Sequence, residues 1–199
     1  ICTYNYQLYH TMISITGLSV QFGGHFLFDN ISLAITKADR IGLVGKNGAG
    51  KSTLLRLLMG QMRPESGNIH FDNNTTLGYL PQEMPIRATK TVYEEAASAF
   101  SEVLQLQETV DRLTSEITHR TDYESTEYLK LVDQLTDAQD HFQRLGGLKM
   151  REQIEKILKG LGFVNGDFDR SLAEFSGGWQ MRVELAKILL RKPSFILLD

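Results

Sequence analysis

The stretch GKNGAGKS, residues 45–52, places three glycines within eight positions. It follows RIGLV, residues 40–44, an apolar run that is short enough and β-branched enough to predict a buried strand. It leads into KSTLLRLLMG, residues 51–60, whose leucines recur at helical spacing. We therefore expect the glycine-rich segment to connect a strand to the start of a helix.

Glycine, lysine and serine in this order suit the binding of phosphate groups. Without side chains on the glycines, several backbone N–H groups can point into one hollow, and the helix N-terminus adds the positive end of its dipole. The pattern G-x-x-x-x-G-K-S predicts a P-loop, with Lys51 on the β- and γ-phosphates of ATP and Ser52 on Mg²⁺. The alternative is a glycine-rich turn that carries a lysine by chance. The residues expected to contact the nucleotide are Gly45, Lys46, Asn47, Gly48, Ala49, Gly50, Lys51, Ser52 and Thr53.

The composition narrows the class of protein. The 199 residues are enough for one sizeable core, and the formal net charge of −3 gives no overall basic field for nucleic acid. The single cysteine, Cys2, rules out an internal disulfide and agrees with a reducing compartment. Because no run of about 18 apolar residues occurs, we expect a cytoplasmic protein without membrane insertion. Residues 1–11 precede a clean alternating pattern and are expected to be extraneous.

A second helix start follows near the end of the chain. EFSGGWQMRVELAKILLRKP, residues 174–193, places a serine and two glycines before an amphipathic run. We expect Ser176 to be the N-cap and Pro193 to end the helix. Small residues before a helix can form a second anion site, because its first N–H groups are exposed.

An acidic residue closes the sequence. PSFILLD, residues 193–199, predicts a strand that ends in Asp199 at the edge where open α/β sheets bind their ligands. We expect Asp199 to hold Mg²⁺ through water. Taken alone, the run would equally fit a plain strand end.

The motifs GKNGAGKS, FSGGWQ and FILLD, in this order, resemble those of an ATP-binding cassette (ABC) nucleotide-binding domain from Met12 onward. The resemblance implies an α/β fold: a P-loop NTPase sheet with an antiparallel edge portion and an inserted α-helical subdomain. It makes Gln82, in LPQ, the expected sensor of Mg²⁺ and of the attacking water, although a loop amide facing solvent is the alternative. Phe22 would stack on adenine, the alternative being an ordinary strand residue.

In this family the serine and glycines of the signature act on a partner. The resemblance therefore implies that Ser176, Gly177 and Gly178 close over an ATP held by a second cassette, so that ATP joins a head-to-tail pair. The general base, a glutamate directly after Asp199, would be residue 200. We expect the full-length parent to hydrolyse ATP with Gln82 and Asp199 as catalytic residues, and the 199-residue chain alone to bind ATP weakly at most.

Two heptad stripes lie between the two glycine motifs. A short polar turn, HRTDYES at 119–125, separates them, which predicts an antiparallel helical hairpin with arms of roughly 30 Å. The alternative is an ordinary helical subdomain packed on the core. The first stripe, expected to run without a break, is Ala96, Ala99, Val103, Leu106, Val110, Leu113 and Ile117; the second is Tyr128, Leu131, Leu135, Ala138, Phe142 and Leu145.

A lengthened hairpin at this place resembles the arm of ABC-F proteins, twin-cassette ATPases that bind the ribosome and influence translation. FSGGW in place of LSGGQ agrees with this resemblance. An ATPase subunit of a membrane transporter is the alternative, and a DNA-repair or chromosome-structure cassette is disfavoured because such proteins insert far larger domains. The expected domains are 12–89 for the first part of the ATP-binding core, 90–160 for the helical subdomain with its arm, and 161–199 for the signature helix and the terminal strand.

Acidic residues dominate the hairpin. Between Glu94 and Arg144 there are 12 acidic residues against four basic ones, a local balance of −8. Because such helices would be repelled by a phosphate backbone, we expect the arm to meet a basic protein surface of the ribosome rather than RNA. A solvated acidic face without a partner is the alternative.

Overall fold

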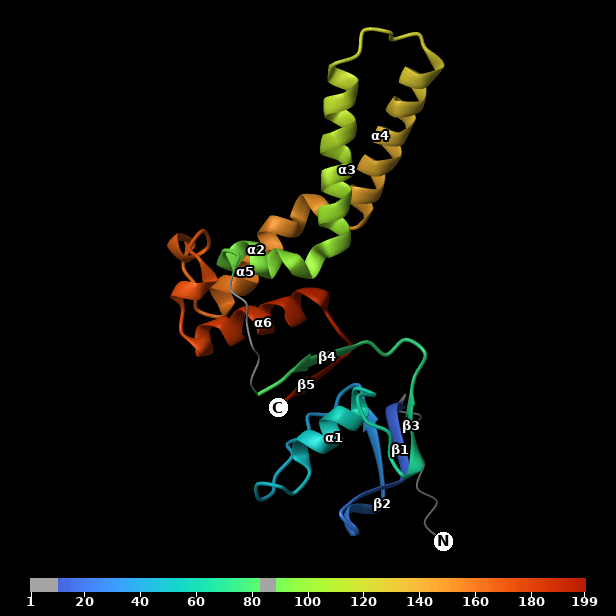
Figure 1. Ribbon diagram of the computed structural model, residues 1–199, viewed down its shortest axis with the longest axis vertical. Helices are drawn as coiled ribbons and strands as arrows, with labels where there is room; N and C mark the ends of the chain where they lie inside the picture. Colours follow the sequence, from blue (N-terminus) through green and yellow to red (C-terminus); the bar gives the residue numbers. More distant parts are fainter. Residues whose placement is uncertain (1–10, 83–88) are drawn as a thin grey trace. The chain divides into compact units, whose positions relative to one another are not determined.

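The computed structural model of the protein describes residues 11–82 and 89–199, which form two compact units (Figure 1). We call residues 11–82 together with 193–199 the sheet unit, and residues 89–192 the helical unit. The segment 161–192, which precedes the last strand, is thus part of the helical unit, whereas the strand itself belongs to the sheet unit.

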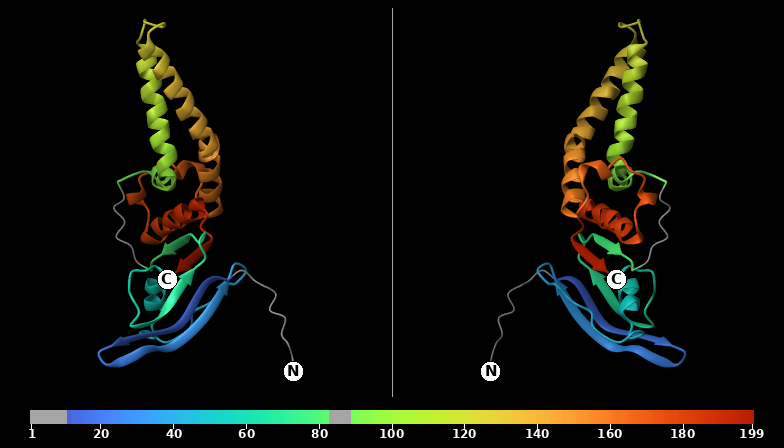
Figure 2. Two further views of the ribbon diagram at one scale, coloured as in Figure 1. Left: turned by 90° about the vertical axis from the view of Figure 1, so that its right-hand side faces the viewer. Right: turned by 90° about the vertical axis from the view of Figure 1, so that its left-hand side faces the viewer.

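Three strands of the sheet unit form an antiparallel sheet in the order β2-β1-β3. Figure 2 shows the first two as a long curved hairpin. Its turn consists of Gly23 and Gly24, whose φ angles of 56° and 82° lie in the left-handed region that a two-residue turn requires. The strands are β1 (Thr11–Phe22), β2 (His25–Thr36) and β3 (Ser66–Phe71).

A second, parallel sheet lies in the same unit. It pairs β4 (Leu77–Leu80) with β5 (Phe195–Leu198), so the strand predicted before Asp199 is confirmed. Helix α1 (Lys51–Leu58), also predicted, buries its leucines in a core that it shares with both sheets. The core residues are Met12, Ile13, Ile15, Leu18, Val20, Ile35, Leu54, Leu55, Leu57, Leu58 and Leu197.

The prediction of a buried strand at residues 40–44 is wrong. This segment has no regular secondary structure, and Ile41, Leu43 and Val44 are 49%, 40% and 94% exposed. An apolar run becomes a buried strand only when neighbouring strands pair with it and cover its faces. Among the described residues no strand pairs with this segment, and β5 pairs only with β4 there. A pocket of about 670 Å³ separates the segment from β5 instead.

The helical unit contains short and long helices around its own core. Lys187 of α6 bridges Glu95 of α2 and Glu184 of its own helix, which ties the two helices together. The core includes Val92, Ile154, Leu158, Phe163, Leu172 and Val183. The helices are α2 (Val92–Ala97), η1 (Ser98–Phe100), α3 (Ser101–Thr118), α4 (Thr126–Arg144), η2 (Gly147–Lys149), α5 (Met150–Gly160), η3 (Asn165–Asp167), η4 (Leu172–Glu174) and α6 (Gly177–Arg191).

Helices α3 and α4 form the predicted antiparallel hairpin, and they lie side by side in all views (Figures 1 and 2). The heptad residues Val103 and Leu113 of α3 and Ala138 of α4 are buried. The expectation of an unbroken first stripe is wrong, because the 3-10 turn η1 separates α2 from α3. Phe100 leaves the helical region there, with φ −106° and ψ 42°.

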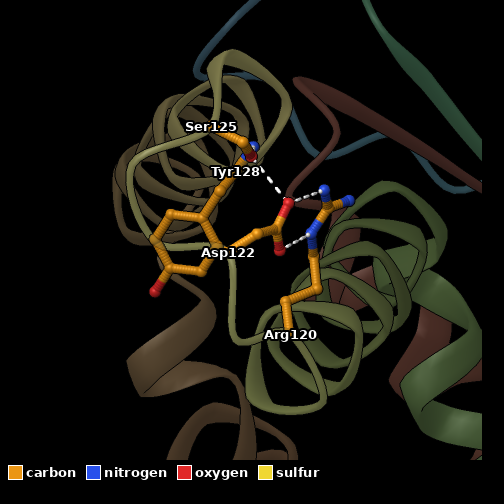
Figure 3. Close-up of polar contacts among 4 residues, drawn as sticks. All are labelled: Arg120, Asp122, Ser125 and Tyr128. Carbon is orange, nitrogen blue, oxygen red and sulfur yellow. Dashed lines mark hydrogen bonds and ion pairs between the residues drawn. The ribbon is translucent and has the colours of Figure 1, made fainter.

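The tip of the hairpin is held by a local polar cluster (Figure 3). The guanidinium of Arg120 donates two hydrogen bonds to the Asp122 carboxylate, of 2.9 and 2.6 Å. Ser125 Oγ donates to Asp122 Oδ2 at 2.7 Å and accepts from the Tyr128 N–H at 3.0 Å. Hydrogen bonds to Arg120 and then to Ser125 hold the pKa of Asp122 well below its usual value. The turn that joins the two long helices is therefore a structured one.

No helix in residues 11–82 and 89–199 combines the length and the apolar character needed to cross a membrane.

Candidate nucleotide-binding site

The P-loop segment lies directly before helix α1, as its spacing predicts. Gly50 is the N-cap of α1 and has φ 96°, and its carbonyl accepts the hydrogen bond from the Leu54 N–H at 2.8 Å. The Lys51 ammonium donates to the carbonyl oxygens of Gly45 and Lys46, each at 3.0 Å. The lysine side chain therefore curls back over the loop that precedes it, where an anion held by the loop would meet a positive charge.

Glycine at position 50 is required by its surroundings as well as by its backbone. A Cβ on Gly50 would lie 2.7 Å from the ring of Phe28 and 3.0 Å from Leu27, both on β2. Its left-handed φ also disfavours a side chain. Gly48 has a left-handed φ too, of 82°, but open space around it. The loop therefore packs against β2 at Gly50, whereas the space around Gly48 is open.

A hydrogen bond connects the P-loop helix to the end of β5. Ser52 Oγ donates to Asp199 Oδ1 at 2.8 Å, across 147 positions of sequence. Two of the three residues predicted to serve Mg²⁺, Ser52 and Asp199, are therefore in contact, whereas Gln82 is not part of this hydrogen bond. A hydroxyl and a carboxylate are oxygen ligands of the kind that Mg²⁺ prefers, and this ion needs few protein ligands when phosphates supply others.

Tyr79 is a third residue at this point, and it was not among the predicted site residues. Its hydroxyl donates to Asp199 Oδ2 at 3.2 Å. Partial burial, followed by the charge and hydrogen bond of Asp199, raises the pKa of Tyr79, so the phenol stays protonated and remains a donor. Only the parallel pairing of β4 with β5 brings Tyr79 close to Asp199. The sequence alone does not fix that register, so this contact could not be predicted from it.

The remaining predicted residues of the sheet unit lie at element ends. Phe22 is the last residue of β1, 53% exposed, and pairs with His25 across the hairpin turn. Gln82 follows β4 and is exposed. Both side chains thus lie at exposed positions, and within the described residues the hydrogen bonds of Lys51 go to Gly45 and Lys46 instead.

Ser176, Gly177 and Gly178 belong to the helical unit. Ser176 is the N-cap of α6 as predicted, yet its side chain makes no capping hydrogen bond. The two glycines form the first turn of α6, and all three residues are exposed. Pro193 follows the helix end, where Lys192 adopts a left-handed conformation. The Ser176 hydroxyl and the first N–H groups of α6 therefore face outward.

The loop before α6 is fixed from within the helical unit. Gln180 Nε2 donates to the carbonyl oxygens of Phe175 and Leu172, at 2.9 and 3.2 Å. Trp179 packs edge-on against Phe163, with ring centroids 4.9 Å apart, and Arg182 lies 4.2 Å above the Trp179 ring. Trp179 thus anchors the helix start in the core, in line with its aromatic character.

The residues present fit Mg²⁺ with a nucleoside triphosphate. The loop offers a bare backbone, Lys51 a positive charge over the loop, and Ser52 with Asp199 a pair of oxygen groups for the ion. Within residues 11–82 and 89–199 no group of three or more His, Cys, Asp or Glu side chains could hold a metal by itself.

Several known proteins are similar to the chain in sequence. A family model described as "ABC transporter" matches residues 28–199. ABC transporter F family member 2 of Arabidopsis thaliana is 35% identical over 192 residues, which cover 94% of this chain and 28% of that protein. The tylosin resistance ATP-binding protein TlrC of Streptomyces fradiae is 30% identical over 194 residues, covering 95% of this chain and 34% of that protein. The chain thus spans about a third or less of these relatives.

Solved structures support the fold. A dimeric, post-hydrolysis structure of an ATP-binding cassette bound to ADP and Pi matches with a TM-score of 0.59 at 19% identity, covering 94% of this chain and 73% of that one. The cbiO1 subunit of an ABC transporter complex from Clostridium perfringens also matches with a TM-score of 0.59 at 19% identity, covering 95% of this chain and 65% of that one. The family match shows that the chain belongs to the ABC transporter family, and its sequence is similar to that of F-family members.

Proposed function

We propose that this chain is the ATP-binding cassette of an ABC-F-type factor that hydrolyses ATP when two cassettes pair. The observation that carries the proposal is the hydrogen bond between Ser52 Oγ and Asp199 Oδ1, at 2.8 Å. It unites the end of a P-loop with the acidic end of a neighbouring strand, which is the arrangement that Mg²⁺ and the phosphates of ATP require.

Each residue of the sheet unit has a distinct part in this proposal. The N–H groups of residues 45–53 and the ammonium of Lys51 bind the phosphates, because both present positive charge to the same hollow. Ser52 and Asp199 hold Mg²⁺, which supplies charge neutralisation for the β- and γ-phosphates. Phe22 provides the stacking face for adenine, and Gln82 orients the attacking water.

The signature residues act on the partner cassette. Ser176 is free of a capping bond to its own helix, so its hydroxyl can donate to a phosphate that approaches from outside. Gly177 and Gly178 leave the first N–H groups of α6 uncovered. We infer that these three residues complete the enclosure of an ATP bound by the second cassette.

Pairing can be tested with Ser176→Arg in the full-length protein. The bulky cation should block the approach of the second cassette and abolish ATP-dependent pairing, measured by light scattering or analytical ultracentrifugation. Binding of a fluorescent ATP analogue to the P-loop should be unchanged. Pairing that persists in this variant would refute the proposal that Ser176 acts on the ATP of the second cassette. Loss of nucleotide binding would refute the proposal that Ser176 plays no part at the P-loop of its own chain.

A role in translation is supported by the arm and by the F-family relatives. The hairpin carries acidic residues on both helices, and its tip exposes Tyr123, 60% accessible, beside the Arg120–Asp122 pair. An acidic surface with an exposed aromatic residue suits a basic protein surface better than a phosphate backbone. We infer that the arm contacts a ribosomal protein.

Crosslinking tests this contact. A photo-reactive side chain at Thr121 should give protein adducts when the full-length protein is incubated with ribosomes from its own host. The same group at Lys156, an exposed position on α5 outside the arm, serves as the control and should give few adducts. Predominantly rRNA adducts from Thr121 would overturn the assignment, and co-purification with a membrane subunit would favour the transporter alternative.

A further inference from the structure

Tyr79 occupies a position that follows from the pairing of two strands. In the parallel ladder of β4 and β5, Tyr79 lies opposite Leu197. Side chains two residues apart on a strand point to the same face, so Asp199 shares the face of Leu197 and Tyr79. The phenol is long enough to span the two-residue advance of roughly 6.6 Å. Its hydroxyl indeed lies 3.2 Å from Asp199 Oδ2.

The Asp199 carboxylate has a separate donor on each oxygen. Ser52 Oγ donates to Oδ1 and Tyr79 Oη donates to Oδ2. The backbone is also fixed, because the Asp199 N–H donates to the Leu80 carbonyl oxygen at 3.0 Å. Three hydrogen bonds, one with α1 and two with β4, thus set the position of Asp199 and the plane of its carboxylate.

The tyrosine itself is anchored. Its ring is partly buried and packs against the core of the sheet unit, so the hydroxyl is held from a rigid strand rather than from a loop. The neutral phenol donates without adding a positive charge beside the carboxylate. A lysine or arginine at this place would compete with a metal cation, whereas a tyrosine leaves the negative charge of Asp199 available.

We propose that Tyr79 is a positioning residue of the metal site, which orients the Asp199 carboxylate toward Mg²⁺. The inference rests on the proposed function of Asp199 and adds a residue that its motif does not contain. The Ser52 oxygen can serve the metal with a lone pair while its hydrogen still bonds Asp199 Oδ1. Tyr79 fixes the second oxygen, so the two donors together set the orientation of the carboxylate.

The experiment is a measurement of metal affinity in the full-length protein with Tyr79→Phe. Phenylalanine keeps the ring and its packing and removes only the hydroxyl. Mn²⁺ binding in the presence of ATP is followed by electron paramagnetic resonance. Loss of an outer partner of a metal ligand weakens metal affinity by about 10- to 100-fold, and we expect about tenfold for this single neutral donor. ATP binding in the absence of metal should be unchanged.

Two further variants make the outcome decisive. Tyr123→Phe removes another tyrosine hydroxyl, at the exposed arm tip, and should leave Mn²⁺ affinity unchanged. Asp199→Asn should abolish most Mn²⁺ binding if the proposed function holds. Normal Mn²⁺ affinity in Tyr79→Phe together with loss in Asp199→Asn would overturn the role of Tyr79 alone. Normal affinity in both variants would overturn the proposed metal site as well.

Discussion

The side-chain amide of Gln180 lies 2.9 Å from the carbonyl oxygen of Phe175, the residue directly before Ser176. The same amide donates to the Leu172 carbonyl oxygen at 3.2 Å, so one side chain on the first turn of α6 holds two carbonyls of the loop that leads into it. Because Ser176 has no capping bond of its own, its placement depends on this contact and on the packing of Trp179.

Gln180→Glu should therefore weaken ATP-dependent pairing of the full-length protein. The substitution is nearly isosteric, but it replaces the donor with an acceptor that faces two carbonyl oxygens. Loss of hydrogen bonds worth about 1 kcal/mol each predicts a decrease in pairing affinity of about five- to thirtyfold. Sedimentation at several ATP concentrations measures it. Gln134→Glu, an exposed change on α4, is the matched control.

Nucleotide binding to the P-loop should be unaffected by Gln180→Glu, since the residue lies in the helical unit. If Gln180→Glu pairs as well as the unchanged protein, Gln180 does not position the signature loop.

Lys51→Ala should remove ATP binding. The ammonium that now donates to the carbonyl oxygens of Gly45 and Lys46 is the positive side-chain charge over the loop. Loss of charge-assisted bonds to phosphates, worth about 1.5 to 3 kcal/mol each, predicts a decrease in ATP affinity of about 100-fold or more. Titration with a fluorescent ATP analogue measures it, with Lys159→Ala on α5 as the control. Tight ATP binding by Lys51→Ala would disprove the assigned role.

Gly67→Ala should loosen the antiparallel sheet. Gly67 has φ 86°, and a Cβ there would lie 2.3 Å from the carbonyl oxygen of Gly17, a backbone atom that cannot move aside. Gly24→Ala is the matched control, because Gly24 has φ 82° but no atom within 4 Å of its Cβ position.

Backbone strain alone costs about 1–2 kcal/mol, and the clash adds about 1–3 kcal/mol more for Gly67→Ala. Native-state hydrogen exchange of the amides paired between β1 and β3 measures this local stability. Equal effects of the two alanines would show that the contact with Gly17 contributes nothing.

The arm tip should keep its structure in moderate acid. The pKa of Asp122 is held below its usual value by Arg120 and Ser125, so the stabilisation is fully present above the usual carboxyl pKa. It is lost only as the pH falls toward the lowered value. At about pH 4, near the pKa of an ordinary aspartate, the Tyr128 amide should remain protected from hydrogen exchange.

A carboxyl carbon shift measured by NMR gives the Asp122 titration directly, and Asp122→Asn supplies the unprotected reference. Titration of Asp122 at the ordinary aspartate pKa would contradict the assigned contacts.

Local patterns predicted most of the elements, because the physics that forms them is also local. The leucines of α1, the small residues before α6 and the heptads of α3 and α4 each depend on neighbours within a few positions. The prediction of a buried strand at residues 40–44 failed because such burial requires pairing with strands that are distant in the sequence. The break at η1 was not predicted either, because Phe100 departs from helical geometry without a nearby proline or glycine to indicate it.

The candidate site divides in the same way. The P-loop and the acid at the end of β5 could be predicted from motif order, and their side chains do meet. Tyr79 could not be predicted, since only the register of β4 against β5 brings it to Asp199. The roles of Phe22 and Gln82 stay predictions, because they concern a nucleotide.

The antiparallel arrangement of α3 and α4 has a consequence for the divergence of related sequences. Because both helices enter and leave at the same base, one heptad inserted into each would extend the arm by about 10.5 Å at 1.5 Å per residue. The paired insertion keeps the apolar faces in phase, whereas an insertion in one helix alone would misalign them. The length of the arm can therefore change in whole heptads during evolution while its base stays unaltered. Such changes would leave the residues of the nucleotide site untouched.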